Sequence, residues 1–204
     1  LLHGKRIVVT AGGTREALDP VRYLGNRSSG IMGYAVAQAA IDAGADVILI
    51  SGPTSLPSPY GAARVDVQTA VQMKDAVSEA VKGAQAIVMS AAVADYRPKD
   101  VRSEKIKKSE LGATLSLDLV TNPDIIAGIG EPGLLKIGFA AETSNLVVHA
   151  QRKLKEKGLD LVVANDAEQA IGSKDNRVTL VWPDGRVEEM PLLPKEDVAP
   201  MLIE

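Results

Sequence analysis

The sequence predicts an α/β fold: a Rossmann-like, doubly wound and mostly parallel sheet with an antiparallel appendage. Short runs rich in β-branched residues alternate along the chain with amphipathic helical segments, which is typical of parallel sheets wrapped by helices. A long glycine-rich stretch, residues 10–33, joins the first run to the first helical segment, a place where open α/β sheets bind phosphates. Near the C-terminus, two apolar runs flank Pro183-Asp184-Gly185, a typical hairpin turn.

The elements of the amino-terminal half follow from periodicity and from boundary residues. Ile31, Val36 and Ala40 lie at helical spacing, and Gly44 ends that helix. The prolines of 51–59 remove hydrogen-bond donors and predict a rigid loop. The expected elements are strands over 5–10, 46–50, 64–67 and 85–90, and helices over 30–43 and 69–81, the second capped by Thr69.

The carboxyl-terminal half departs from this alternation over 97–120, where charged residues dominate. We expect this excursion to be a flap, a dimerisation arm or both, with a half-exposed strand over 114–119. The other expected elements are a short helix opened by Asn122-Pro123-Asp124, strands over 135–139 and 161–164, a helix from Ser144 to Lys157 stopped by Gly158, a hairpin of 178–182 and 187–190, and a helix after Pro194.

Composition narrows the class of protein. A chain of 204 residues can bury a real core, and we expect one domain over 1–204. A net charge of −3 predicts no general affinity for nucleic acid or membrane, and no apolar run approaches a membrane span. The absence of cysteine excludes a thiolate metal site and agrees with a cytoplasmic protein. No signal peptide is visible, and the abrupt start suggests a piece cut from a longer chain.

The carboxyl ends of the predicted strands are the expected ligand site, because open α/β sheets bind ligands there. Small residues predominate at these ends and let a ligand approach the backbone. Ser28, Ser29, Gly30 and Gly33 form a helix start suited to phosphate; the alternative is a plain serine cap with glycines for close packing. The segments concerned are 11–14, 51–53, 91–95, 140–143 and 165–166.

Charged side chains suggest a way to handle an anionic ligand. Asp95 follows a strand and could hold Mg²⁺ through phosphate oxygens. Lys105, with its neighbours Lys107 and Lys108, could neutralise charge developing on a phosphate, or could simply be solvated. Lys153 and Lys157 are four residues apart and share a helix face, with solvation again the alternative.

The ordered motifs of the chain closely resemble those of bacterial phosphopantothenoylcysteine synthetases (phosphopantothenate–cysteine ligases). The resemblance covers nearly the whole chain. In many bacteria this enzyme is the carboxyl-terminal half of a bifunctional coenzyme A protein, fused to a decarboxylase that uses FMN. The motifs are Asp19-Pro-Val-Arg22, Asn26-Arg-Ser-Ser-Gly30, Ser51-Gly-Pro53, Ala91-Ala-Val-Ala-Asp95-Tyr96, Lys105-Ile-Lys-Lys108, Asn122-Pro-Asp-Ile125, Gly138-Phe-Ala-Ala-Glu-Thr143 and Ala164-Asn-Asp166.

The resemblance implies a two-step ligation that uses CTP and Mg²⁺. The carboxylate of 4′-phosphopantothenate attacks the α-phosphate of CTP and gives an acyl-cytidylate and pyrophosphate; L-cysteine then displaces CMP. Asn26 would act on the acyl-cytidylate, and an asparagine amide suits orientation and oxyanion stabilisation. Lys105 would assist the first step, and the Lys-Ile-Lys-Lys motif is typical of the CTP-using bacterial enzymes. The family is dimeric, so a homodimer is implied.

The resemblance also implies a set of contact residues. Asp95 would lie where nucleotide, metal and phosphopantothenate meet, with Asn26, Ala91 and Ala92 on the substrate. Ala17 and Ile31 depart from the family pattern; at position 31 many relatives carry a lysine, so one cation is missing from the helix start. The implied nucleotide contacts are Gly12, Ser28, Gly30, Gly33, Met89, Ser90, Ala91, Asp95, Lys105, Pro123, Asp124, Ile125, Ile126, Phe139, Lys153 and Lys157.

Two other functions compete with the ligase. A nicotinamide-dependent oxidoreductase would use a similar sheet, but the second strand ends in Ser51-Gly52-Pro53 and lacks the acid that binds a ribose. A domain that senses a nucleotide or binds a partner would bind CTP without producing pyrophosphate.

Overall fold

The computed structural model describes residues 1–108, 113–142, 144–166 and 173–204. Residues 109–112 of the predicted excursion, and Thr143 at the end of a predicted motif, lie outside the described part of the chain.

A central sheet confirms the predicted fold class. Among the described residues it has eight strands, in the order β13-β12-β10-β9-β6-β1-β4-β5. The strands from β10 to β5 pair in parallel, whereas β12 and β13 pair antiparallel at one edge and form the predicted hairpin. The strands are β1 (Arg6–Ala11), β4 (Asp46–Ser51), β5 (Ala63–Asp66), β6 (Ala86–Met89), β9 (Leu135–Glu142), β10 (Leu161–Asp166), β12 (Val178–Val181) and β13 (Val187–Glu189).

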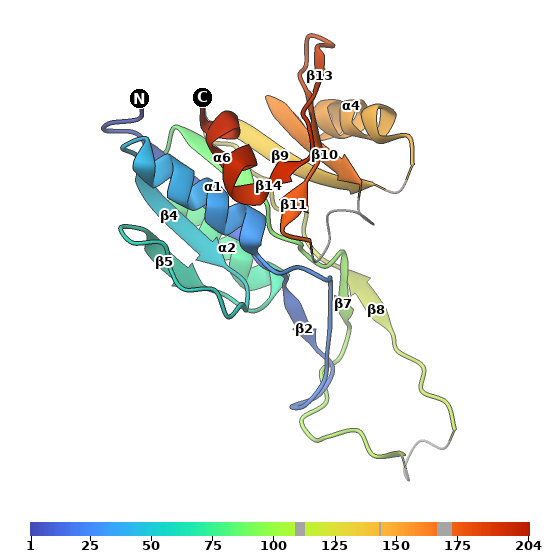
Figure 1. Ribbon diagram of the computed structural model, residues 1–204. Helices are drawn as coiled ribbons and strands as arrows, with labels where there is room; N and C mark the ends of the chain where they lie inside the picture. Colours follow the sequence, from blue (N-terminus) through green and yellow to red (C-terminus); the bar gives the residue numbers. More distant parts are fainter. Residues whose placement is uncertain (109–112, 143, 167–172) are drawn as a thin grey trace.

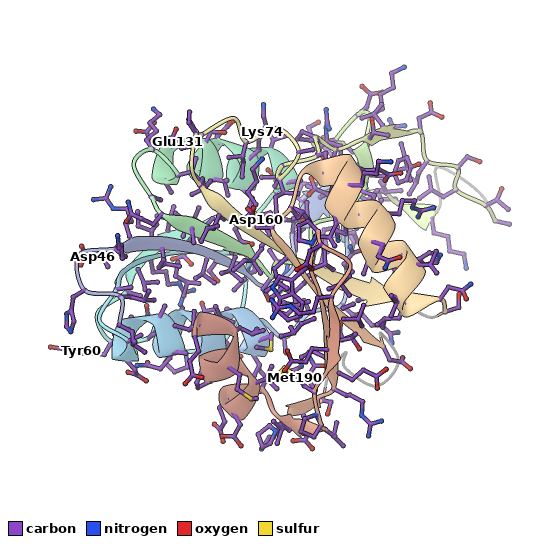
Figure 2. All side chains as sticks on the ribbon, turned by 90° about the horizontal axis from the view of Figure 1, so that it is seen from above. Asp46, Tyr60, Lys74, Glu131, Asp160 and Met190 are labelled. Atoms are coloured by element: carbon purple, nitrogen blue, oxygen red, sulfur yellow. The ribbon has the colours of Figure 1, made fainter. Side chains whose placement is uncertain are left out.

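Helices cover both faces of the sheet (Figure 2). Helices α1 (Ile31–Asp42) and α6 (Lys195–Ile203) lie on one face, and α2 (Ala70–Ala80) and α4 (Leu146–Lys157) lie on the other. Successive side chains of β1 point to opposite faces of the sheet, so the core has two parts. Val9 belongs with Val36 to the part under α1, whereas Val8 belongs with Met73 and Leu154 to the part under α2 and α4. No helix in the described ranges is long and apolar enough to cross a membrane.

The helix boundaries agree with the sequence prediction for α1 and α2 but not for the start of α4. Thr69 caps α2 and forms a reciprocal capping box with Gln72. Helix α4 starts after Asn145, which has a φ of 49° and makes no side-chain cap bond, so the prediction that Ser144 caps this helix is wrong. Gly158 ends α4 in the left-handed conformation, as predicted.

Small two-stranded sheets account for the segments outside the main sheet (Figure 1). The long loop of 10–33 contains an unpredicted hairpin of β2 (Arg15–Ala17) and β3 (Tyr23–Gly25). The excursion over 97–120 is flanked by β7 (Tyr96–Pro98) and β8 (Leu119–Thr121), and it projects from the body of the molecule as an arm. Strands β11 (Asp175–Asn176) and β14 (Leu193–Pro194) pair beside α6.

Other local predictions were wrong. The segment 114–118 is not a strand: Leu115 and Leu117 alternate as predicted but are 45% and 40% exposed. The helix expected at Asn122 is replaced by single turns, because the Asn122 amide donates to the Ala94 carbonyl instead of capping a helix. The strand expected over 135–139 is confirmed as β9, and only its end differs, because it runs on to Glu142.

Candidate functional site

Two cavities open at the carboxyl ends of the central strands, where ligands bind in open α/β sheets. Their volumes are about 540 and 560 Å³. They share a wall, so one ligand could extend from the first cavity into the second. The shared residues are Ala91, Val93, Asp95, Phe139 and Lys153.

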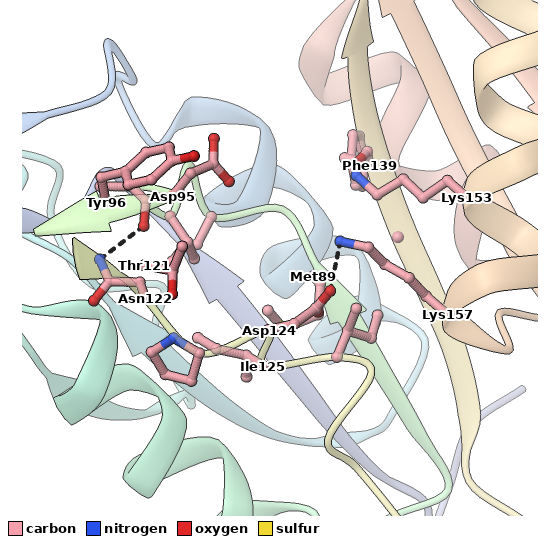
Figure 3. A pocket seen from close by; sticks show the side chains of 16 residues that line it. Met89, Asp95, Tyr96, Thr121, Asn122, Asp124, Ile125, Phe139, Lys153 and Lys157 are labelled. Atoms are coloured by element: carbon pink, nitrogen blue, oxygen red, sulfur yellow. Dashed lines mark hydrogen bonds and ion pairs between the residues drawn. The ribbon is translucent and has the colours of Figure 1, made fainter. Parts of the chain in front are cut away.

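The first cavity gathers most of the residues implied for the nucleotide (Figure 3). They come from the end of β6 and the loop after it, from β9 and α4, and from the turn after β8, which are distant in sequence. The predicted lining residues are Met89, Ala91, Asp95, Pro123, Asp124, Ile125, Ile126, Phe139, Lys153 and Lys157. Val93 and Ala94 also line it and belong to the segment 91–95 expected at the ligand site, whereas sequence reasoning missed Tyr96, Thr121, Asn122 and Gly138 as lining residues.

The two lysines of α4 point into this cavity, since positions four apart share a helix face (Figure 3). Lys153 Nζ donates to the carbonyl oxygen of Phe139. Burial, and then the positive charge of Lys157, lower the pKa of Lys153. Lys157 Nζ lies 3.1 Å from Asp124 Oδ2 across the cavity. Lys153 is therefore not a simple solvated charge, and an anion in the cavity would favour its charged form.

Asp95 lines both cavities. Its backbone carbonyl accepts a hydrogen bond from the backbone N–H of Asn122 at 2.7 Å, and the Arg97 guanidinium donates to the side-chain oxygen of Asn122 at 3.0 Å. The described ranges contain no cluster of three or more His, Cys, Asp or Glu side chains suited to a metal. Asp95 could therefore hold Mg²⁺ only together with oxygens of a bound ligand, since Mg²⁺ takes one or two carboxylates plus substrate oxygens.

The second cavity is built around the start of α1. Gly30, with a φ of 80°, precedes the first helical residue, and no side chain caps the helix at that position. The Ser28 and Ser29 hydroxyls accept from the N–H groups of Gly30 and Ile31 at 3.3 and 3.5 Å, so they partly act as local caps. Its other predicted lining residues are Asn26, Gly33, Ser90, Ala91 and Ala92. Sequence reasoning missed Arg27, Met32, Asn176 and Lys195 as lining residues.

Hydrogen bonds fix the loop of residues 90–95, which contributes residues to both cavities. Thr10 Oγ1 accepts from the Ala91 N–H at 3.2 Å, and Thr14 Oγ1 accepts from the Ala94 N–H at 2.9 Å. Asn26 Nδ2 donates to the Val93 carbonyl at 3.0 Å. The Asn26 amide is thus held against the loop that separates the two cavities.

Two predicted site residues line neither cavity. A Cβ on Gly12 would meet the Gly52 carbonyl oxygen at 2.9 Å, so Gly12 permits close backbone packing beneath the site. Lys105 lies on the arm, next to Ile106, whose N–H donates to Asp19 Oδ2 at 3.1 Å. The Arg22 guanidinium donates to the Ile106 carbonyl, so the 19–22 turn holds the arm backbone beside Lys105.

The end of β4 does not provide the acid of a nicotinamide site. Ser51 is fully buried, and its hydroxyl lies 2.9 Å from the Tyr34 hydroxyl. Gly52 packs against Gly13. A ribose hydroxyl would find no carboxylate from this strand end.

The fold and the paired cavities define an α/β protein with its ligand site at the carboxyl edge of a parallel sheet. The chain belongs to the DNA/pantothenate metabolism flavoprotein C-terminal domain family, whose model matches residues 2–204. The resemblance inferred from the motifs is therefore confirmed.

Two curated relatives carry the name coenzyme A biosynthesis bifunctional protein CoaBC. The Vibrio cholerae protein is 48% identical over 98% of this chain and 51% of its own length. The Escherichia coli K12 protein is 46% identical over 97% of this chain and 50% of its own length. The chain thus spans about half the length of the curated relatives it matches. A crystal structure of the C-terminal domain of CoaBC superposes with a TM-score of 0.85, at 43% identity, covering 99% of this chain and 93% of that one.

Proposed function

We propose that this chain, as one domain over 1–204, ligates 4′-phosphopantothenate and L-cysteine at the expense of CTP, as a step of coenzyme A biosynthesis. The observation that carries the proposal is the shared wall of the two cavities, on which Asp95 and Lys153 contact both spaces. A ligation through an activated acyl group needs a nucleotide and an acid side by side. The relatives' names support the same pathway.

In the first step, the substrate carboxylate attacks the α-phosphorus of CTP, and the bond from that phosphorus to the pyrophosphate oxygen breaks. Lys153 and Lys157 supply positive charge from α4 to the nucleotide phosphates. Asp95 is the carboxylate that would hold Mg²⁺ together with phosphate oxygens, and the ion would neutralise phosphate charge. The turn of 123–126 and Phe139 would contact the nucleotide.

In the second step, the cysteine amine attacks the acyl carbon, the acyl–phosphate bond breaks and CMP leaves. The Asn26 amide donates to Val93 in the free protein and can turn its donor toward the acyl oxygen. Ala91 and Ala92 present little side-chain bulk beside it, which lets the substrate approach the backbone. Asn26 would orient the acyl group and stabilise the negative charge on its oxygen.

Lys105 would contribute to the first step from the arm. It lines neither cavity, so the arm of this copy, or of a second copy, must bring it to the phosphates. The arm also exposes Leu115, Leu117 and Leu119, each 40–45% exposed. This apolar stripe supports a homodimer in which the arm contacts the second copy. The native protein would be cytoplasmic and fused to an FMN-dependent decarboxylase.

The test measures pyrophosphate and product separately. CTP and 4′-phosphopantothenate should release pyrophosphate without cysteine, and mass spectrometry should detect the amide when cysteine is added. Release with ATP but not CTP would contradict the nucleotide assignment. CTP binding without pyrophosphate, with all substrates present, would favour a nucleotide-sensing domain. Saturable NADPH binding without ligation would favour the oxidoreductase.

A further inference from the structure

Lys195 is a buried lysine in the wall of the second cavity, and the proposed reaction assigns it no role. It is the first residue of α6 and is only 6% exposed. Its ammonium donates to the Ser173 carbonyl at 2.8 Å. Burial lowers the pKa of Lys195, and the charge of Asp175 partly offsets this.

The last part of the chain brings Lys195 to the site. Strands β11 and β14 pair Asn176 with Leu193, and the Lys195 N–H donates to the Lys174 carbonyl at 3.0 Å. The Asn165 side chain donates to Asn176 Oδ1 at 3.3 Å and ties this strand pair to the end of β10. Helix α6 lies along α1, so the start of each helix borders the same cavity (Figure 1).

The charges around this cavity favour an anion. Among the described lining residues, Arg27, Lys153 and Lys195 are cationic, against the single carboxylate of Asp95. Helix α1 has no acidic residue in its first turn, so no side-chain charge complements the positive end of its dipole. Lys195 supplies a cation to this cavity from a different helix.

We propose that Lys195 is a phosphate-binding residue, which holds a phosphoryl group between its ammonium and the first turn of α1. A phosphoryl group has several acceptor oxygens and can bond backbone N–H groups and a lysine together. The group belongs to the nucleotide or to the phosphorylated acid. The inference rests on the proposed function, because that function supplies the two phosphorylated ligands.

The test compares Lys195→Gln with Lys174→Gln. Glutamine keeps a donor for the Ser173 carbonyl but removes the charge, whereas Lys174 is exposed on the same segment and does not line the cavity. Calorimetric titrations use inorganic pyrophosphate, 4′-phosphopantothenate and unphosphorylated pantothenate. Lys195→Gln should weaken one phosphorylated ligand by about 10- to 100-fold, and Lys174→Gln should not change it. Lys195→Arg should restore much of the affinity.

The titrations distinguish the two sources of the phosphoryl group. Weaker pyrophosphate binding assigns Lys195 to the nucleotide, and weaker phosphopantothenate binding with unchanged pantothenate assigns it to the acid. Unchanged affinity for both phosphorylated ligands overturns the proposal. If Lys195→Gln does not fold, the Lys195 ¹³Cε resonance of labelled wild-type protein decides, since it should shift with one ligand, and no shift would reject the role. Wild-type protein that binds these anions but forms no amide would refute only the ligase function.

Discussion

Gly33 decides how closely the start of α1 approaches β1, and its replacement by alanine tests whether that distance controls the reaction. A Cβ at this position would lie 2.6 Å from the Ala11 Cβ and 2.9 Å from the Thr10 carbonyl oxygen. Carbon atoms in favourable contact are about 3.5–4.0 Å apart, so the start of α1 must shift by about 1 Å. Both neighbours belong to the central strand and cannot yield easily.

The expected effects on stability and activity differ in size. Overpacking of this kind costs about 1–3 kcal/mol. The better helix propensity of alanine returns about 1 kcal/mol, so we expect a free energy of unfolding lower by about 0–2 kcal/mol. A displacement of about 1 Å at a reacting site can lower the rate by about 100-fold. Gly33→Ala should therefore remain folded but release pyrophosphate 10- to 100-fold more slowly, by the same rough estimate.

Urea unfolding and the pyrophosphate assay measure the two effects on the same protein. Gly130→Ala is the control, because a Cβ on Gly130 meets no atom within 4 Å and its φ is not positive. The control should leave both quantities unchanged. If Gly33→Ala released pyrophosphate at the wild-type rate, the position of the α1 start would not govern the first step, and the reasoning would be refuted.

Three further predictions concern the acyl group, the arm and acid stability. Asn26→Asp should keep most pyrophosphate release but accumulate acyl-cytidylate in quench experiments; equal loss of both steps would reject its assignment to the second. Lys105→Gln should slow pyrophosphate release more than amide formation from preformed acyl-cytidylate, and unchanged release would remove Lys105 from the mechanism. Burial raises the pKa of Asp19, but bonds from the Ile106, Val21 and Arg22 N–H groups and the Arg22 charge lower it overall. The ionised Asp19 carboxylate therefore stabilises the folded protein above an unfolded-state pKa of about 3.9. This stabilisation is lost as the pH falls through the lower pKa that Asp19 has in the folded protein. Acid unfolding curves of wild type and Asp19→Asn should thus differ most above pH ~4 and converge below it; curves offset equally at every pH would contradict this.

Much of the fold is encoded locally. The β-branched runs that became β1, β4 and β10 were predictable because a buried parallel strand needs apolar residues on both faces. Thr69 and Gly158 marked helix ends because capping and left-handed turns depend on residue type. The errors arose where distant contacts override local preference: Asn122 bonds to Ala94 instead of starting a helix.

The candidate site was predictable where a motif follows a strand. Asp95 and Phe139 were found in this way, since carboxyl ends of parallel strands share one edge. Lys153 and Lys157 depended on helical spacing, and the sequence could not distinguish cavity lysines from solvated ones. Lys195 gave no local signal, because its place in the cavity depends on the β11–β14 pairing.

The sequence by itself determined the strands of the central sheet, the helices that cover it, the glycine-rich start of α1 and the family, because these depend on residue type and short-range spacing. The tertiary structure decided which charges meet. Packing places Asp95 and Lys153 in the wall that the two cavities share, and it buries Lys195 in the wall of the second cavity. It also brings Asp19 to the arm, where it accepts a hydrogen bond from the Ile106 N–H. Such contacts join residues far apart in the chain, and their geometry exists only when the sheet and its two helical layers have packed together.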